Sequence, residues 1–302
     1  MWEAAGGAGD RSEAPGAGLL GLPETGDAGA LAGMALVALG LPLNGDRSWP
    51  DAVRRLSQAY AGWLPDPATG FRAADYGDVE VVVDDPAVAF MQAHERLADI
   101  VAAGAAPLVL GGDALVSVPV LQVLSGKLRG RIGVVAFTPS YDVAPEPLYS
   151  AGSRWARALE LGVLAPANLA LLGGRQAPPD GPARAVLEQL GATALSLEDV
   201  LGDGMSAVAQ EALEIAAAGT EAVYLSVDLG VVAGSGDPVG LEVRELVEGV
   251  RVVASALLAA ADVCGADPGV DPPGVGVSSA AATSAAARVA AEIAAGVARR
   301  LT

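Results

Sequence analysis

Leu108-Val-Leu-Gly-Gly-Asp-Ala114 is the stretch of sequence that decides the fold, together with Ile132-Gly-Val-Val-Ala-Phe-Thr-Pro-Ser-Tyr-Asp142. Each is a short apolar run that stops at small and polar residues. Strands of a parallel sheet that is buried on both faces read as near-continuous apolar runs. Open α/β sheets place their chemistry beyond the carboxyl ends of such strands. We therefore expect residues 111–114 and 138–142 to lie side by side at the mouth of a site.

Strand-like runs alternate with helical patterns along the whole chain. This alternation predicts an α/β fold with three layers (α/β/α), in which helices cover both faces of a central parallel sheet. We expect a disordered N-terminal arm at residues 1–18, which is rich in Gly and Ala, and a single domain at 19–302. Further strands are expected at 35–42, 168–172, 221–228 and 261–264, and helices at 52–60, 85–100, 116–124, 150–161, 183–190, 204–218, 241–260 and 279–301.

Composition excludes several classes of partner. The formal net charge is −18, which argues against nucleic acid and anionic membrane surfaces. No apolar stretch reaches the ~20 residues that a membrane span needs, and no basic segment followed by an apolar core marks a signal peptide. Cys264 is the single cysteine, which fits a reducing compartment. We expect a cytoplasmic protein.

Seven short motifs, in order, resemble those of the ureohydrolases, the arginase and agmatinase superfamily, and of the agmatinase branch in particular. The resemblance covers nearly the whole chain and implies an arginase-like fold. The matching segments are Leu19-Leu-Gly-Leu-Pro23 with Ala38-Leu-Gly-Leu-Pro42 for the start of that branch, Trp49-Pro-Asp-Ala-Val-Arg-Arg55 for GPRAIR, Asp75-Tyr-Gly-Asp78 for DxGD, Gly111-Gly-Asp-Ala114 for GGDH, Phe137-Thr-Pro-Ser-Tyr-Asp142 for FDAHxD, Ser226-Val-Asp-Leu-Gly230 for SxDxD and Gly240-Leu-Glu-Val-Arg-Glu245 for GLTxRE.

The resemblance implies hydrolysis of a guanidino group by a hydroxide that bridges two divalent metal ions. Carried over position by position, the ligand set is incomplete, because only Asp142 and Asp228 match metal-binding aspartates. Alanine and glycine have no donor atom, and hydroxyl groups replace imidazole poorly. The segment that carries a catalytic histidine in the family has Ala151 at that position. The positions that lack the family's ligand or catalytic residue are Ala114, Thr138, Ser140, Ala151 and Gly230.

Four acidic residues form what we call the vestigial pocket: Asp113, Asp142, Asp228 and Glu245. Asp113 either braces its glycine-rich turn or touches a ligand. Glu245 matches a glutamate that contacts guanidinium in the family, yet it also stands in a first helical turn, where a carboxylate favours the helix dipole. His94, the only histidine, is expected on a helix surface away from the strand ends.

These observations favour a non-catalytic subunit that supports an active paralogous subunit in a hetero-oligomer, trimeric or hexameric as the resemblance implies. We expect no cofactor in this chain and a divalent metal pair, nickel or manganese, in the active partner. The arrangement is similar to heteromeric, nickel-dependent metformin hydrolase, which pairs an active with a degenerate subunit. Two alternatives stay open: a module that binds a guanidinium or amine without turnover, and a hydrolase that uses a single metal ion.

Overall fold

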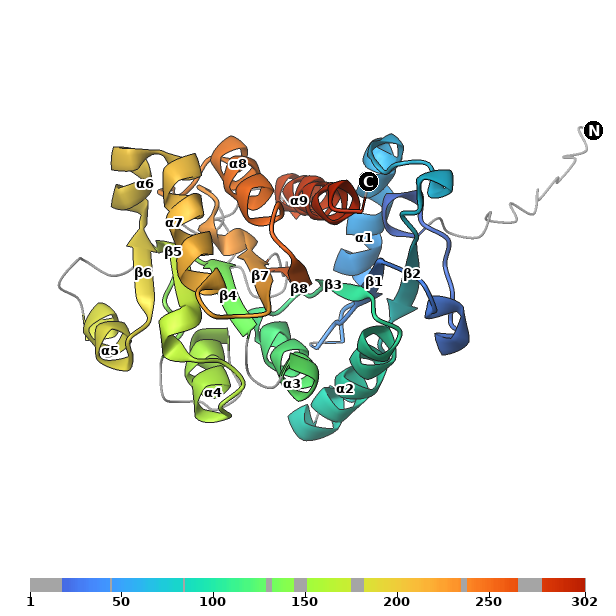
Figure 1. Cartoon of the computed structure of the whole chain (residues 1–302), viewed down its shortest axis with the longest axis horizontal. Helices are drawn as coiled ribbons and strands as arrows, with labels where there is room; N and C mark the ends of the chain where they lie inside the picture. Colours follow the sequence, from blue (N-terminus) through green and yellow to red (C-terminus); the bar gives the residue numbers. More distant parts are fainter. Residues whose placement is uncertain are drawn as a thin grey trace, which may run out of the picture.

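The computed structural model describes residues 18–43, 45–83, 85–128, 132–143, 151–174, 182–234, 238–265 and 279–301. Its centre is an eight-stranded sheet with the order β2-β1-β3-β8-β7-β4-β5-β6, in which every neighbouring pair is parallel (Figure 1). This confirms the predicted parallel sheet. The strands are β1 (Leu36–Gly40), β2 (Ala73–Asp78), β3 (Ala106–Leu110), β4 (Ile132–Phe137), β5 (Leu169–Gly174), β6 (Thr193–Ser196), β7 (Ala222–Asp228) and β8 (Leu258–Cys264).

Helices cover both faces of the sheet, which confirms the three layers (Figure 1). One face carries α1 (Ser48–Ser57), α6 (Leu197–Asp203), α7 (Met205–Ala217), α8 (Val243–Val253) and α9 (Ser279–Arg299). The other face carries α2 (Pro86–Ala102), α3 (Ser117–Leu128), α4 (Arg154–Glu160) and α5 (Pro182–Leu190).

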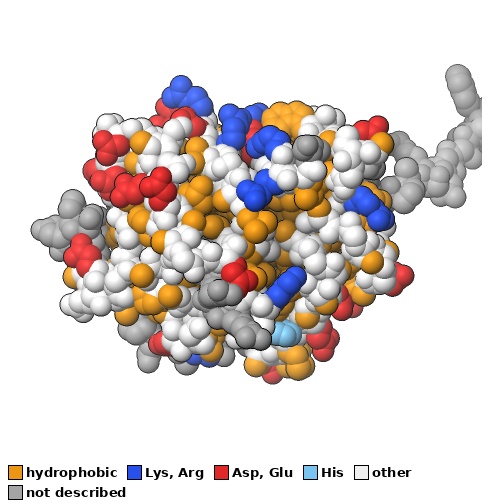
Figure 2. All heavy atoms as spheres, in the orientation of Figure 1, with side chains coloured by type: hydrophobic (Ala, Val, Ile, Leu, Met, Phe, Trp, Pro, Cys, Tyr) orange, Lys and Arg blue, Asp and Glu red, His pale blue; other side chains and the backbone are white. Residues whose placement is uncertain are grey.

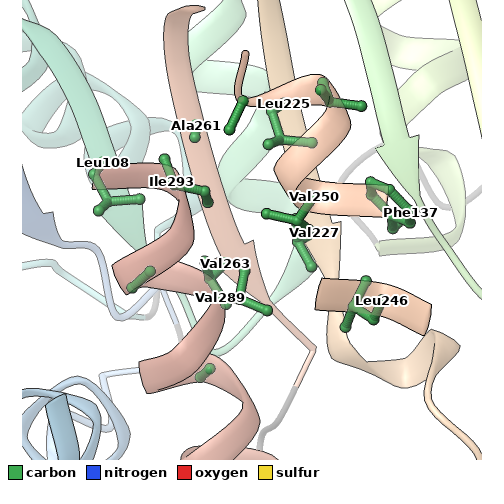
Figure 3. Packing of buried hydrophobic residues seen from close by; sticks show 14 of the residues in the cluster. Leu108, Phe137, Leu225, Val227, Leu246, Val250, Ala261, Val263, Val289 and Ile293 are labelled. Carbon is green, nitrogen blue, oxygen red and sulfur yellow. The ribbon is translucent and has the colours of Figure 1, made fainter. Parts of the chain in front are cut away.

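The core forms two layers because successive strand residues point to opposite faces. Val223, Leu225 and Val227 of β7 belong to the cluster under α8 and α9, whereas Tyr224, which lies between the first two, belongs to the other cluster. Figure 3 shows Val250 of α8 and Ile293 of α9 lying over the central strands. Small side chains let these helices approach closely: a Cβ at Gly296 would lie 2.4 Å from the Ala254 carbonyl oxygen.

One expectation about the strand order was wrong. The strands that precede residues 111–114 and 138–142 are not neighbours, because β8 and β7 lie between β3 and β4. The last strand of the chain is inserted into the middle of the sheet, and local sequence carries no signal for such long-range pairing. All four strands are parallel, so their carboxyl ends still open on the same edge.

Element boundaries differ from the predictions at three places. The predicted helix over 241–260 ends at Val253, and β8 begins at Leu258; the alanine-rich stretch between them has no Gly or Pro to mark the break. The short edge strand β6 and helix α6 were missed. The helix predicted over 52–60 begins earlier, at Ser48, and Arg47 holds its N-cap position without a side-chain hydrogen bond.

Other boundaries are confirmed. Asp85 caps α2, accepting hydrogen bonds from the backbone N–H groups of Ala87 and Val88 at 3.0 and 3.2 Å. The arm predicted at residues 1–18 lies outside the described residues except for Gly18. None of the described helices is both long and apolar enough to cross a membrane.

A buried carboxylate ties α9 to α8. Glu292 of α9, 3% exposed, accepts hydrogen bonds from Arg251 of α8 at 2.6 Å and from Arg288, one turn earlier on α9, at 2.9 Å. Burial opposes ionisation of this group, but the two arginines outweigh it and hold the pKa of Glu292 below its ordinary 4.5. The ionised carboxylate is therefore part of what joins these helices over the sheet.

We expect Glu292→Gln to lower the free energy of unfolding at pH 7 by about 1–2 kcal/mol, because two charge-assisted hydrogen bonds weaken. A carboxylate whose pKa is depressed in the folded state stabilises above its unfolded pKa and loses that contribution as pH falls through the folded pKa. The difference between variant and wild type should therefore shrink below about pH 4.5. Urea unfolding at pH 7, 5 and 3.5 measures this difference. Glu160→Gln serves as control, because Glu160 is an exposed partner of Arg157; a pH-independent difference for Glu292→Gln would contradict the assignment.

Candidate functional site

The candidate site lies at the carboxyl edge of the four central strands. Ala114 stands in the short turn after β3, Thr138 follows β4, and Asp228 and Cys264 end β7 and β8. Asp228 and Cys264 are paired neighbours in the register of these two strands. Four chain segments that are distant in sequence therefore converge here, as expected from the strand-end argument.

Arg154, the first residue of α4, fills the centre of this site. Its side chain is fully buried, and its Nε lies 2.8 Å from Oδ2 of Asp142. Its Nη2 donates to Oγ1 of Thr138 at 2.9 Å and to Oδ2 of Asp228 at 3.4 Å. Its Nη1 donates to the carbonyl oxygen of Ala114 at 3.5 Å. In the resemblance, six positions match metal ligands: Ala114, Thr138, Ser140, Asp142, Asp228 and Gly230. One guanidinium thus contacts four of these six positions.

The two carboxylate partners keep the guanidinium of Arg154 protonated. Burial alone lowers the pKa of Arg154, but Asp142 and Asp228 raise it above its ordinary value, so the side chain stays cationic. Burial raises the pKa of Asp142, and Arg154, together with hydroxyl donors, opposes that shift. A buried ion pair of this kind resists loss of either partner, because the remaining charge would be left without compensation.

The loop after β4 wraps tightly around Asp142. Thr138 Oγ1 donates to the carbonyl oxygen of Ser140 at 2.7 Å and lies 3.3 Å from Asp142 Oδ2. Ser140 Oγ also donates to the Asp142 carboxylate. Asp142 itself has a φ of 46°, a left-handed conformation that is uncommon for a residue other than Gly. The two hydroxyl residues at lost ligand positions therefore hold Asp142 toward Arg154.

The end of β7 is closely packed, so that an added side chain would require its neighbours to shift. Asp228 Oδ1 accepts a hydrogen bond from the N–H of Gly230 at 2.9 Å. A Cβ at Gly230 would lie 2.9 Å from that same oxygen and 3.0 Å from Pro139. At Gly265, which has a φ of +78°, a Cβ would overlap the Asp228 carboxylate at 1.8 Å. The position that matches the family's second aspartate thus has little room for a carboxylate.

A second buried acid lies beneath this site. Asp262 of β8 is fully buried and accepts hydrogen bonds from Ser117 at 3.0 Å, from Ser226 at 3.1 Å and from the hydroxyl of Tyr224. Burial raises the pKa of Asp262, and burial together with Asp262 raises the pKa of Tyr224 well above 10. Three hydroxyl donors thus compensate the carboxylate of Asp262. In the described structure this carboxylate lies more than 4 Å from the guanidinium nitrogen atoms of Arg154.

Cys264 adjoins both groups of residues. It is buried, as its apolar strand indicates, and its Sγ lies 3.8 Å from Arg154 Nη1. Burial and the neighbouring Asp262 and Asp228 raise the pKa of this thiol well above its ordinary 9.0. The thiol therefore stays protonated and is no thiolate donor at neutral pH.

The structure brings together only part of the vestigial pocket. Asp142 and Asp228 meet at Arg154, whereas Asp113 accepts from the N–H of Leu115 at 2.7 Å and caps its own turn. Glu245 accepts from the N–H of Glu242 at 2.8 Å in a capping box that begins α8. For both residues, the described contacts match the structural reading left open above.

The sequence also drew attention to Ala151 and His94. Ala151 starts the short turn Ala151–Ser153 directly before α4, three residues ahead of Arg154. His94 is exposed on α2, as predicted from its place in the helix, and this single histidine shows on the surface in pale blue (Figure 2). Within the described part of the chain, no three His, Cys, Asp and Glu side chains are grouped so that they could hold a metal ion.

Sequence reasoning missed Arg154, Asp262 and Tyr224. Arg154 stands next to Trp155 in a segment examined only for a histidine, although an arginine is a natural partner for carboxylates that lack a metal. Asp262 was visible as a charged residue inside the apolar run of β8. A charge that interrupts a buried strand demands a partner, and this signal could have led to the hydroxyl cluster.

Comparison with known proteins agrees with this architecture. The sequence profile described as the arginase family matches residues 29–296. Guanidinopropionase of Pseudomonas aeruginosa is 29% identical over 194 residues, a match that spans 60% of this chain and 60% of that protein. The chain therefore matches less than two thirds of the length of this relative.

Two solved structures share the fold. Proclavaminate amidino hydrolase of Streptomyces clavuligerus superimposes with a TM-score of 0.78 at 23% identity, covering 95% of this chain and 98% of that one. A hypothetical agmatinase of Burkholderia thailandensis gives a TM-score of 0.78 at 24% identity and covers 95% and 92%. Because the profile match runs from before β1 into α9, the chain belongs to the arginase family.

Proposed function

We propose that this chain is a non-catalytic subunit of an agmatinase-like hydrolase of guanidino compounds, and that it assembles with an active paralogous subunit. One observation carries the proposal: the guanidinium of Arg154 lies between Asp142 and Asp228, where the resemblance would place metal ions. Membership of the arginase family supplies the scaffold. The residues at the strand ends support the proposed loss of hydrolytic function.

The residues present do not fit a pair of divalent ions. Two such ions bring about four positive charges, and Asp142 and Asp228 already compensate Arg154. Ala114 and Gly230 offer no side-chain donor, and the hydroxyls of Thr138 and Ser140 are engaged with the loop that holds Asp142. Without activation of water by metal, the retained aspartates have no evident hydrolytic role. They orient and neutralise Arg154.

The substrate class follows from relatives in the family. Their names include guanidinopropionase and agmatinase, so a linear guanidino compound is the proposed substrate of the assembly. The active partner would hold the divalent metal pair, nickel or manganese. Metformin hydrolase, with one active and one degenerate subunit, is the arrangement that the proposal resembles, and metformin is accordingly one substrate to assay.

Neither alternative gains support from the site geometry. A module that binds an external guanidinium would use Asp142, Asp228 and Glu245 as a pocket, but Arg154 occupies the two aspartates and Glu245 caps α8. A hydrolase with a single metal ion would need the same two aspartates. Both alternatives therefore require that Arg154 leave its position.

Co-expression with an intact paralogue tests the assembly. The paralogue should carry the GGDH, DAHxD and SxDxD residues that this chain lacks. We expect one peak of constant stoichiometry on size-exclusion chromatography, with hydrolysis of agmatine or metformin by the complex. Two separate peaks, each containing one chain, would sink the proposal. A paralogue with the histidine of its GGDH motif changed to alanine is the matched control, because the complex should then form without turnover.

The isolated chain should be inactive. After incubation with Mn²⁺ or Ni²⁺ and desalting, we expect less than about a tenth of an equivalent of metal by elemental analysis, since a complete ligand set is needed to retain an ion. No urea should be released from agmatine or metformin, and calorimetry with agmatine, arginine and metformin should show no binding heat. Turnover by the isolated chain would overturn the non-catalytic assignment, whereas heat without turnover would favour the binding module.

A further inference from the structure

We propose that Arg154 is a built-in cation that replaces the divalent metal pair and closes the strand-end site to external cations. The inference concerns this chain alone and holds whether or not a partner subunit exists. It assigns a role to a residue that the family motifs do not mark. Geometry, charge and packing around the guanidinium support this role.

The geometry places this cation at the positions that match metal ligands. The guanidinium touches the Ala114 carbonyl, the Thr138 hydroxyl and the carboxylates of Asp142 and Asp228, at distances from 2.8 to 3.5 Å. These groups come from the segments after β3, β4 and β7. Arg154 therefore joins the same chain segments that a metal cluster would join, by hydrogen bonds in place of coordination.

A cation is needed at this site because two buried carboxylates require compensation. Asp142 and Asp228 are 9% and 8% exposed, so water compensates their charges only in part. A buried carboxylate without a partner is strongly unfavourable. If the lost ligands had left an empty site, the two aspartates would repel each other at the edge of the sheet. One guanidinium, which can serve several oxygen atoms at once, removes that problem.

Packing explains why the site is closed. The Arg154 side chain is fully buried, and the backbone around Asp228 is close enough that a Cβ at Gly230 or Gly265 would meet its carboxylate. An external guanidinium or a divalent ion would have to displace a side chain that is fixed to the first turn of α4. The site is thus occupied by the chain itself.

A purely structural ion pair is the competing explanation, and the chain offers a matched example. Arg54 is 7% exposed and bridges Asp75 at 2.8 Å and Asp78 at 2.6 Å. If Arg154 were only such a brace, its removal would weaken the fold without creating a site for metal. A comparison of Arg154 variants with Arg54 variants therefore distinguishes an arginine that replaces a metal ion from one in an ordinary buried salt bridge.

The first experiment tests charge compensation. Arg154→Met should lower the melting temperature by about 10 °C, because it leaves two aspartates without their counter-charge. Adding Asp142→Asn and Asp228→Asn, which keep shape and one acceptor oxygen each, should recover at least half of that loss. The same two asparagine substitutions in Arg54→Met should recover nothing. Failure of the triple variant to regain stability, or to fold, would contradict a role in compensating these carboxylates.

The second experiment tests exclusion of metal. Mn²⁺ should raise the melting temperature of Arg154→Ala in a saturable way, or raise its folded yield if the variant folds poorly in buffer. The wild type, Arg54→Ala and the triple variant Arg154→Ala, Asp142→Asn, Asp228→Asn should show no such response. A Mn²⁺ response in the wild type, or none in Arg154→Ala, would overturn the inference. Because no partner is needed, these outcomes are independent of the co-expression result.

Discussion

The contact of Arg154 with Asp142 and Asp228 is the interaction on which the carboxyl edge of the sheet depends. Parallel strands collect their polar ends at one edge. In this chain that edge carries two aspartates that are largely buried. A positive charge must accompany them if the sheet is to keep its register there, and α4 supplies it from its first residue.

The molecule compensates its buried acids in three ways. Arg154 and Arg54 each bridge two aspartates with one guanidinium. Asp262 receives three hydroxyl donors and no cation at ion-pair distance in the described residues. Glu292 is buried, pairs with two partly exposed arginines and joins two helices. Each arrangement satisfies the rule that buried charges are paired or hydrogen-bonded, yet among these described groups only the aspartates paired with Arg154 stand at positions that match metal ligands in the resemblance.

Much of the fold could be read from the chain, because apolar runs, turn residues and the order of family motifs are local signals. The alternation of β4, α4 and β5 is of this kind. Strand order is not: β8 pairs with β3 across about half of the chain, and no short pattern reports it. At the site, the positions without a donor side chain could be read one by one from the sequence, whereas the arginine that pairs with the two aspartates could not. Arg154 reaches Asp228 across 74 positions, and only the folded backbone reveals that distance.

The crowding around Gly230 has a consequence for how this protein can change. A side chain at that position would meet the Asp228 carboxylate and the Pro139 ring, which would have to shift, and an ion entering beside it would meet Arg154. An acidic side chain at Gly230 would thus add a third negative charge beside two aspartates that already share one cation. Substitutions at the strand ends are therefore coupled, because a change at Gly230 alters the electrostatic balance of Asp228 and Arg154 as well as the local packing.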